Sequence, residues 1–238
     1  MTERLYREDS YLRDAMGRVL EHTPEGGIVL DRTVFYAKGG GQPGDSGRID
    51  WQGQSLIIAT AVPVGDDAVA LVPAEPAPLP PVGVQVSQHI DWERRHRIMR
   101  VHTALHLLSV VIPLPVTGGS ISAGSGRLDF AMPEPPEDRE AIEQTLNDLV
   151  DRDLVVRADW VDEEVLDATP ELVRTMSVRP PRGSGRVRLV RIGEGAGQVD
   201  LQPCGGTHVA RTGEIGTIRL GKIENKGRQN RRVNISLG

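Results

Sequence analysis

Cysteine is nearly absent from the 238-residue chain, since Cys204 is its only copy. The chain therefore cannot form an internal disulfide, and this fits a reducing compartment. No apolar run approaches the roughly 18 residues of a membrane span. The first fourteen residues are charged throughout and lack the apolar core of a secretory signal. We therefore expect a cytoplasmic protein.

Aromatic residues are also scarce, at 3% of the chain, with three Trp, three Tyr and two Phe. Proteins hold unpaired bases mainly by stacking them on aromatic rings. Extensive base stacking is therefore not expected. If this chain binds nucleic acid, recognition should rest on phosphate and shape.

The net charge is only −5, but charges of opposite sign are segregated along the chain. Residues 134–171 hold fourteen acidic residues against three Arg, whereas residues 211–238 hold seven Lys and Arg against two Glu. A second basic stretch contains Arg179, Arg182, Arg186, Arg188 and Arg191. Segregated basic patches can bind a phosphate backbone locally. The charges can equally be ordinary solvated faces of strands and loops.

The segment 73–83, PAEPAPLPPVG, holds five prolines and suits neither a helix nor a strand interior. We predict a domain boundary there, with a first domain at 1–83 and a second at 84–238. The alternative is a proline-rich loop inside a single domain. Before this segment, short strand-like runs bounded by Gly and Asp predict a small β-barrel. Within it lies KGGGQPGDSG, whose residues Gly39, Gly40 and Gly41 suit positive φ or the close approach of a ligand.

The second half alternates between helical and extended patterns, which predicts an α+β fold. A helix is expected at 91–111, with Asp91 as N-cap, Pro113 as stop, and Ile98, Val101, Leu105, Leu108 and Ile112 on one face. Further helices are expected at 137–153 and near 162–175. Strands are expected at 154–160, 186–192, 215–223 and 231–237.

Two pairs of residues suggest a metal site. His102 and His106 are four apart on the first predicted helix, so both rings project from one face. That spacing alone is weak evidence for a metal site. The second pair is stronger evidence for a metal site because it uses the only cysteine. The two glycines in Cys204-Gly-Gly-Thr-His208 allow a tight turn that points both side chains toward one place.

Three imidazoles and one thiolate form a ligand set suited to zinc, and we expect Zn²⁺ at His102, His106, Cys204 and His208. One alternative is a closed zinc that only joins helix to loop, and another is a set of ordinary core residues. His96 is off the shared helix face, and His22 and His89 have no motif around them.

These motifs resemble a known family. HTALH, CGGTHV and KIENKGRQNRRVNI look like motifs of the editing domain of alanyl-tRNA synthetase and of its free-standing relatives, the AlaX proteins. VFYAKGGGQPGDSG is similar to the glycine-rich motif of the family, with Lys38 where an acid is expected. The resemblance extends from about Val34 to Ile235 and fits the medium-length form. It implies a small N-terminal β-barrel followed by an α+β zinc-binding editing domain.

The resemblance also implies a function. A chain without room for an aminoacylation domain would act in trans, deacylating mischarged tRNA(Ala), mainly the seryl ester and as a second candidate the glycyl ester. The segment VTGGSISAGSGRLDF is similar to the substrate-sensing loop of the family, where Thr117 would read the amino acid side chain.

The tRNA would bind through its acceptor stem and CCA end. Basic residues near the C-terminus are candidates for the stem phosphates, and the glycine turn is a candidate for the CCA end. These predicted RNA-binding residues are Gly39, Gly40, Gly41, Lys222, Lys226, Arg228, Arg231 and Arg232.

Hydrolysis of the ester would need an activated water, which zinc supplies, yet four protein ligands would close a tetrahedral shell. Either one residue yields or the shell expands. Two rival functions stay open, a tRNA-binding module with a structural zinc and a zinc peptidase. The peptidase is disfavoured because HTALH lacks the glutamate that follows the first histidine in zincins. The editing domain of threonyl-tRNA synthetase shares the general metal arrangement but not the glycine-rich half.

Overall fold

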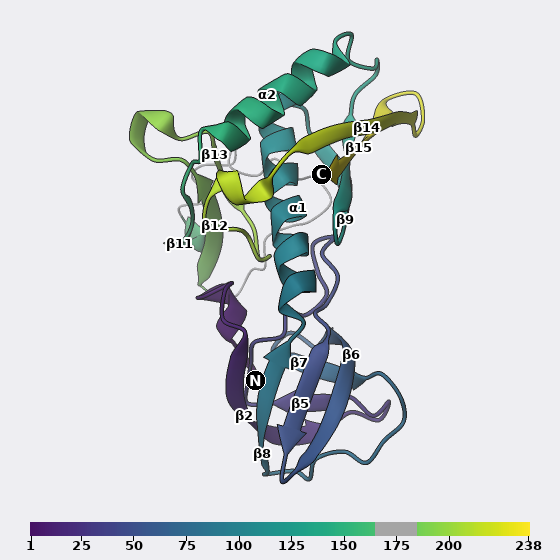
Figure 1. The fold of residues 1–238 in the computed structure, drawn as a ribbon, viewed down its shortest axis with the longest axis vertical. Coiled ribbons are helices and arrows are strands. Elements are labelled where there is room, and N and C mark those ends of the chain that lie inside the picture. Colours follow the sequence, from purple (N-terminus) through teal and green to yellow (C-terminus); the bar gives the residue numbers. More distant parts are fainter. Residues whose placement is uncertain (165–184) are drawn as a thin grey trace. The chain divides into compact units, whose positions relative to one another are not determined.

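The computed structural model describes residues 1–164 and 185–238, and these form a mixed α+β fold, as predicted (Figure 1). The described helices are α1 (Trp92–Val111) and α2 (Arg139–Asp151). Neither of them is both long and apolar enough to cross a bilayer. The chain divides into two compact units, Met1–His96 and Arg97–Gly238.

The first unit is built on a closed six-stranded barrel in the order β2-β3-β7-β6-β5-β8. The barrel strands are β2 (Asp14–His22), β3 (Ile28–Leu30), β5 (Gly47–Trp51), β6 (Gln54–Val64), β7 (Ala68–Pro73) and β8 (Gln85–Ile90). Two short strands, β1 (Glu3–Arg4) and β4 (Arg32–Thr33), pair in parallel beside it. Apolar residues alternate along the strands and fill the interior, with Ile49, Ile58 and Leu71 fully buried.

The proline-rich segment 73–83 does not separate the barrel from a second domain. It leads from β7 into β8, and β8 pairs with both β2 and β5. The predicted boundary at residue 83 is therefore wrong, and the alternative of a proline-rich loop inside one domain holds. Composition could not reveal this, because a stiff extended segment can connect strands as well as domains.

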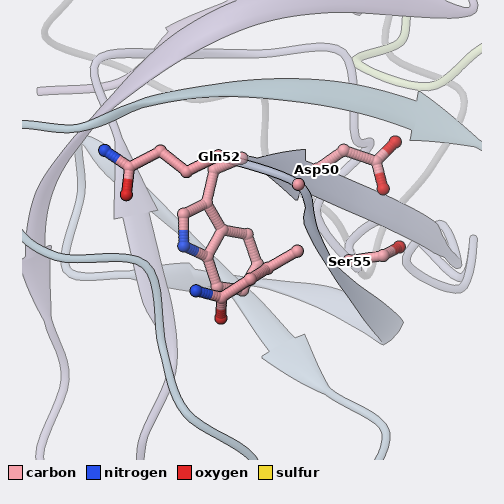
Figure 2. Close-up of a pocket in the computed structure, with 6 residues that line it drawn as sticks. Asp50, Gln52 and Ser55 are labelled. Carbon is pink, nitrogen blue, oxygen red and sulfur yellow. The ribbon is translucent and has the colours of Figure 1, made fainter.

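A tight turn closes the β5–β6 hairpin. Gln52 and Gly53 both have positive φ, as the central residues of a two-residue hairpin turn require. Figure 2 shows a hollow at this turn, lined by Asp50, Trp51, Gln52, Gly53, Gln54 and Ser55. Ser55 donates a hydrogen bond to the Asp50 carboxylate and is the main reason that the pKa of Asp50 is lowered.

A buried ion pair fixes the glycine-rich segment within this unit. The Arg95 guanidinium binds both carboxylate oxygens of Asp45 through Nε, at 3.0 and 2.9 Å, and neither side chain is exposed. Arg95 also donates to the carbonyl of Val34 at 2.6 Å. Next to Asp45, Gly44 packs directly on the neighbouring strand, since a Cβ there would lie 2.1 Å from the Ala61 carbonyl oxygen.

The second unit holds two antiparallel sheets and most of α1 (Figure 1). The order of the first is β14-β15-β10-β9, and that of the second is β11-β12-β13. The strands are β9 (Val116–Ser122), β10 (Ser125–Ala131), β11 (Val156–Asp162), β12 (Arg186–Ile192), β13 (Asp200–Pro203), β14 (Ile218–Asn225) and β15 (Asn230–Leu237).

Helix α1 forms as its sequence predicts. The Asp91 carboxylate accepts a hydrogen bond from the Arg94 amide at 3.0 Å, which is the geometry of an N-cap. The five apolar residues predicted for one face of this helix and its end are all buried. In α2, which lies within the helix predicted at 137–153, Asp138 caps the N-terminus, and Leu146 and Leu149 are buried.

The predicted strands are confirmed with shifts of a few residues at their ends. The predicted helix near 162–175 falls mostly outside the described residues, and Asp162 itself ends β11. One prediction is wrong: VTGGSISAGSGRLDF is not a loop but the β9–β10 hairpin. Its many glycines and serines have low strand propensity, so the sequence did not indicate strands. The strands form nevertheless because β10 pairs with β15.

Breaking the buried pair between Arg95 and Asp45 should destabilise the first unit. Arg95→Met leaves Asp45 charged, buried and unpaired, and should lower the free energy of unfolding by about 3–5 kcal/mol. Arg32→Met breaks the exposed pair with Glu3 and should cost less than about 1 kcal/mol. Urea denaturation of both variants checks this. Equal losses would show that the buried pair has no special role.

Candidate metal centre

Four side chains from distant parts of the chain converge in the second unit. His102 and His106 come from α1, and Cys204 and His208 come from the loop after β13. Each offers one ligand atom, and all four atoms lie within 4.8 Å of one another. The Cys204 sulfur is 3.5 Å from His102 Nε2 and 3.3 Å from His208 Nε2. The three histidines are buried and Cys204 is half-buried.

The loop that carries Cys204 is held by strand β12. The Cys204 amide donates to the Arg188 carbonyl at 3.1 Å and extends the β12–β13 pairing by one residue. The buried Arg188 side chain donates hydrogen bonds from Nη1 to the carbonyls of Cys204 and Gly206, at 2.8 and 3.0 Å. The turn is thus fixed at its start and its middle.

The orientation of His106 is set by a carboxylate. Its Nδ1 lies 2.8 Å from Asp200 Oδ2, and Gln202 Nε2 donates to the same Asp200 oxygen at 2.9 Å. Because an ionised carboxylate only accepts, Nδ1 carries the proton. A metal ion would therefore bind at Nε2 of His106 in place of any proton there, which is the arrangement of a carboxylate-supported metal histidine.

The orientation of His208 follows from the hydroxyl of Thr103. This hydroxyl donates its one proton to the Met99 carbonyl at 3.0 Å. It can therefore only accept from His208 Nδ1, which lies 3.2 Å away. Nδ1 is protonated, and Nε2 faces Cys204 with its lone pair.

The electrostatics of the cluster favour a bound cation. Burial raises the pKa of Cys204, but the nearby His102 and His208 rings outweigh it and hold that pKa well below its usual value. Burial and the His102 charge lower the pKa of His208. Burial also lowers the pKa of His106, but bonds to Asp200 and Cys204 prevail and raise it to about 10. A buried thiolate beside imidazole nitrogens can hold a metal ion, which would displace the Nε2 proton of His106.

Thr117 is a strand residue at a bulge rather than a loop residue. It lies on β9 where the pairing with β10 shifts register between Asp129 and Phe130. Its hydroxyl donates to the Asp129 carbonyl at 3.1 Å and accepts from Asn230 Nδ2 at 2.8 Å. Within the part of the chain that the structure describes, one acceptor position of this hydroxyl stays available.

The predicted glycine turn lies in the first unit. Gly39 and Gln42 exchange two backbone hydrogen bonds, at 3.1 and 2.9 Å, around Gly40 and Gly41, whose φ angles are +55° and +82°. Tyr36 donates its hydroxyl to the Gly39 carbonyl at 2.9 Å. All three glycines are exposed. The turn is thus a rigid, accessible stretch of backbone.

The predicted basic residues divide into two groups. Arg231 bonds to the Pro133 and Gly227 carbonyls, and Arg232 pairs with Asp129 at 2.8 Å, so both brace the β14–β15 hairpin. Lys226 pairs with Glu224 at 3.4 Å. Lys222 and Arg228 are exposed.

Sequence reasoning missed the residues that support the cluster, namely Thr103, Arg188, Asp200 and Gln202. A signal was present for two of them. Asp200 and Gln202 precede Cys204 at intervals of two, the spacing that places strand residues on one face. Thr103 and Arg188 carry no such pattern.

Zinc titration tests whether the cluster binds one ion. We expect one zinc per chain in the wild type. Cys204→Ala should lower the zinc affinity by more than roughly 100-fold, which is the largest loss expected when only an outer-sphere partner is removed. Competition with a chromophoric chelator measures the affinity. His96→Ala, on the same helix outside the cluster, should bind normally. If Cys204→Ala kept the wild-type affinity, the cluster would not be the binding site.

Two family models match the chain. "Threonyl and Alanyl tRNA synthetase second additional domain" matches residues 187–234, which include Cys204 and His208. "tRNA synthetases class II (A)" matches residues 12–94, which include the barrel strands.

Curated relatives of two kinds are similar to the chain. The alanine–tRNA ligase of Pyrobaculum arsenaticum is 36% identical over 94% of this chain but over only 25% of its own length, so the chain spans a quarter of that enzyme. The alanyl-tRNA editing protein AlaX-M of Saccharolobus solfataricus is 34% identical over 98% of both chains. AlaX-M of Methanosarcina acetivorans is 33% identical over 100% of this chain and 99% of its own. The chain therefore belongs to the family of alanyl-tRNA editing proteins named AlaX-M.

Proposed function

We propose that this protein removes wrongly attached amino acids, serine foremost, from tRNA(Ala). The observation that carries the proposal is the four-residue cluster, since its loop lies inside the matched synthetase additional domain. The end-to-end similarity to AlaX-M proteins supports action in trans on tRNA charged elsewhere. A second site is chemically necessary, because a pocket shaped for alanine cannot cleanly reject glycine or serine.

Zinc fits the cluster as its resident metal. Tetrahedral zinc with ligands at about 2.0–2.3 Å places neighbouring ligand atoms about 3.3–3.8 Å apart. The sulfur–nitrogen separations of 3.3 and 3.5 Å lie in this range. Bound zinc would polarise the ester carbonyl and lower the pKa of water. His102, His106, Cys204 and His208 are the residues that would hold it.

The residues around the cluster have separate tasks in this scheme. Asp200 and Thr103 keep the protons of His106 and His208 on Nδ1, away from the centre. Arg188 keeps the cysteine loop in place. Cys204 is the one member of the cluster that is only half-buried, so the ester should approach from its side.

Thr117 can select serine by accepting a hydrogen bond. Its proton is committed to Asp129 and one acceptor position to Asn230, so a remaining lone pair can accept from the hydroxyl of a seryl group. Alanine has no hydroxyl and gains nothing at this position. The ester of alanine should therefore be the poorer substrate.

The tRNA contacts in this proposal are electrostatic. Lys222 and Arg228 are the candidates for acceptor-stem phosphates, because both are exposed. Lys226 can join them, whereas Arg231 and Arg232 act mainly by bracing the hairpin. Exposed backbone at Gly39, Gly40 and Gly41 is the candidate contact for the CCA end.

Deacylation assays test the function. Purified protein should release serine from seryl-tRNA(Ala) faster than alanine from alanyl-tRNA(Ala), and a chelator should stop the release until zinc is restored. Glycyl-tRNA(Ala) in parallel ranks the second candidate. A tRNA-binding module with a structural zinc would bind without turnover, and that result would refute the proposal. Peptide hydrolysis without ester hydrolysis would favour the peptidase.

The serine preference should depend on Thr117. Thr117→Val keeps the shape but cannot accept a hydrogen bond, so the ratio of seryl to alanyl kcat/KM should fall about 3- to 10-fold. Thr117→Ser keeps the hydroxyl and is the matched control. An unchanged ratio in Thr117→Val would remove Thr117 from the specificity site.

A further inference from the structure

A row of side chains crosses the β11-β12-β13 sheet at the level of the metal cluster. Trp160 on β11 directly opposes Arg188 on β12. Arg188 in turn accepts the backbone hydrogen bond of Cys204, one residue beyond the pair Leu189–Pro203. Directly opposed residues of an antiparallel sheet share a face. Trp160, Arg188 and Cys204 therefore lie in one row on one face.

This face is the one that carries the cluster. Asp200 and Gln202 on β13 alternate with Cys204, the residue just after that strand, and they reach His106 and Ser109 on α1. Figure 1 shows the sheet beside that helix. By register, the Trp160 ring is on the same side as the metal ligands.

Among the residues that the structure describes, this face is exposed at β11. Ala158 and Asp162, two residues before and after Trp160 and thus on its face, are both exposed, and Trp160 is half-buried. The other two tryptophans have structural roles, since Trp51 is buried in the barrel and Trp92 packs against the barrel core. A large, half-exposed aromatic ring on an open sheet face is a suitable surface for a flat ligand.

The distance from Trp160 to the cluster suits a nucleoside. Two strand spacings separate β11 from β13, which is about 9–10 Å. This is comparable to the span of a nucleoside from its base to an ester on its ribose. A base on Trp160 would thus bring its ribose ester toward Cys204, the solvent-accessible side of the cluster.

A positive charge accompanies the ring. The guanidinium of the exposed Arg186, next along β12 on the same face, lies 5.9 Å from the centroid of Trp160. An aromatic ring with a neighbouring arginine is the combination that holds single-stranded nucleic acid, the ring for a base and the cation for its phosphate.

We propose that Trp160 is the stacking platform for the terminal adenine of the tRNA, with Arg186 at the phosphate of that nucleotide. The aminoacyl ester is carried on the ribose of this adenosine, so the platform places the ester against the cluster. The inference rests on the proposed function for its choice of ligand. It adds one specific base contact to a chain whose aromatic content argues against extensive stacking.

Binding of two RNA minihelices tests the platform without relying on turnover. Both are uncharged acceptor-stem hairpins; one ends in adenosine and the other in an abasic ribose. On the wild type, the abasic end should weaken binding about 5- to 150-fold, the range that corresponds to loss of one base–aromatic stack. On Trp160→Leu, the two RNAs should bind equally, at the weak level.

Trp160→Phe retains an aromatic ring and should keep most of the preference for the adenosine end. Zinc content and melting temperature identify any variant that has not folded, and the wild-type comparison of the two RNAs stands without variants. Equal binding of both RNAs by the wild type would overturn the proposal, as would an adenosine preference that survives in Trp160→Leu. A wild type that prefers adenosine but releases no serine would instead refute the proposed function.

Discussion

Four ligand atoms crowded within 4.8 Å form the constraint on which the second unit depends. Burying three imidazoles and a thiolate is costly unless a cation joins them, because each loses water and the protonated forms repel one another. Their neighbours reduce this cost by fixing the protons. Asp200 and Thr103 hold a ring proton of His106 and of His208 on Nδ1, and so leave Nε2 of each ring as the atom that an ion would bind.

The helix α1 links this constraint to the rest of the chain. Its first turns carry Arg95, whose buried pair with Asp45 organises the glycine-rich segment of the barrel. Its middle carries His102 and His106, and its apolar face is buried. The strand β13 supplies Asp200 and Gln202 to support a ligand, and the loop that follows it supplies Cys204 as a ligand itself. One helix and one strand therefore account for most of the candidate site.

The sequence predicted those features that depend on local spacing. Asp91, the apolar face of α1 and both metal pairs follow from helical periodicity or from a short glycine turn. It failed where tertiary pairing overrides local preference, as in the glycine- and serine-rich β9–β10 hairpin and in the proline-rich barrel loop. The role of Arg188 and the role proposed for Trp160 depend on strand register, which no local pattern specifies. Likewise, only the hydrogen bonds of the hairpin show that Arg231 braces the backbone, unlike the exposed Lys222.

The central claim is that one metal ion joins helix α1 to the loop after β13. Its ligands are His102, His106, Cys204 and His208. X-ray absorption at the zinc edge of the zinc-loaded protein tests it most directly. The account predicts one sulfur at about 2.3 Å and two or three imidazole nitrogens at about 2.0–2.1 Å. One further oxygen ligand from solvent in that shell would identify the position open to substrate. A coordination shell without sulfur, or with more than one sulfur, would contradict the account.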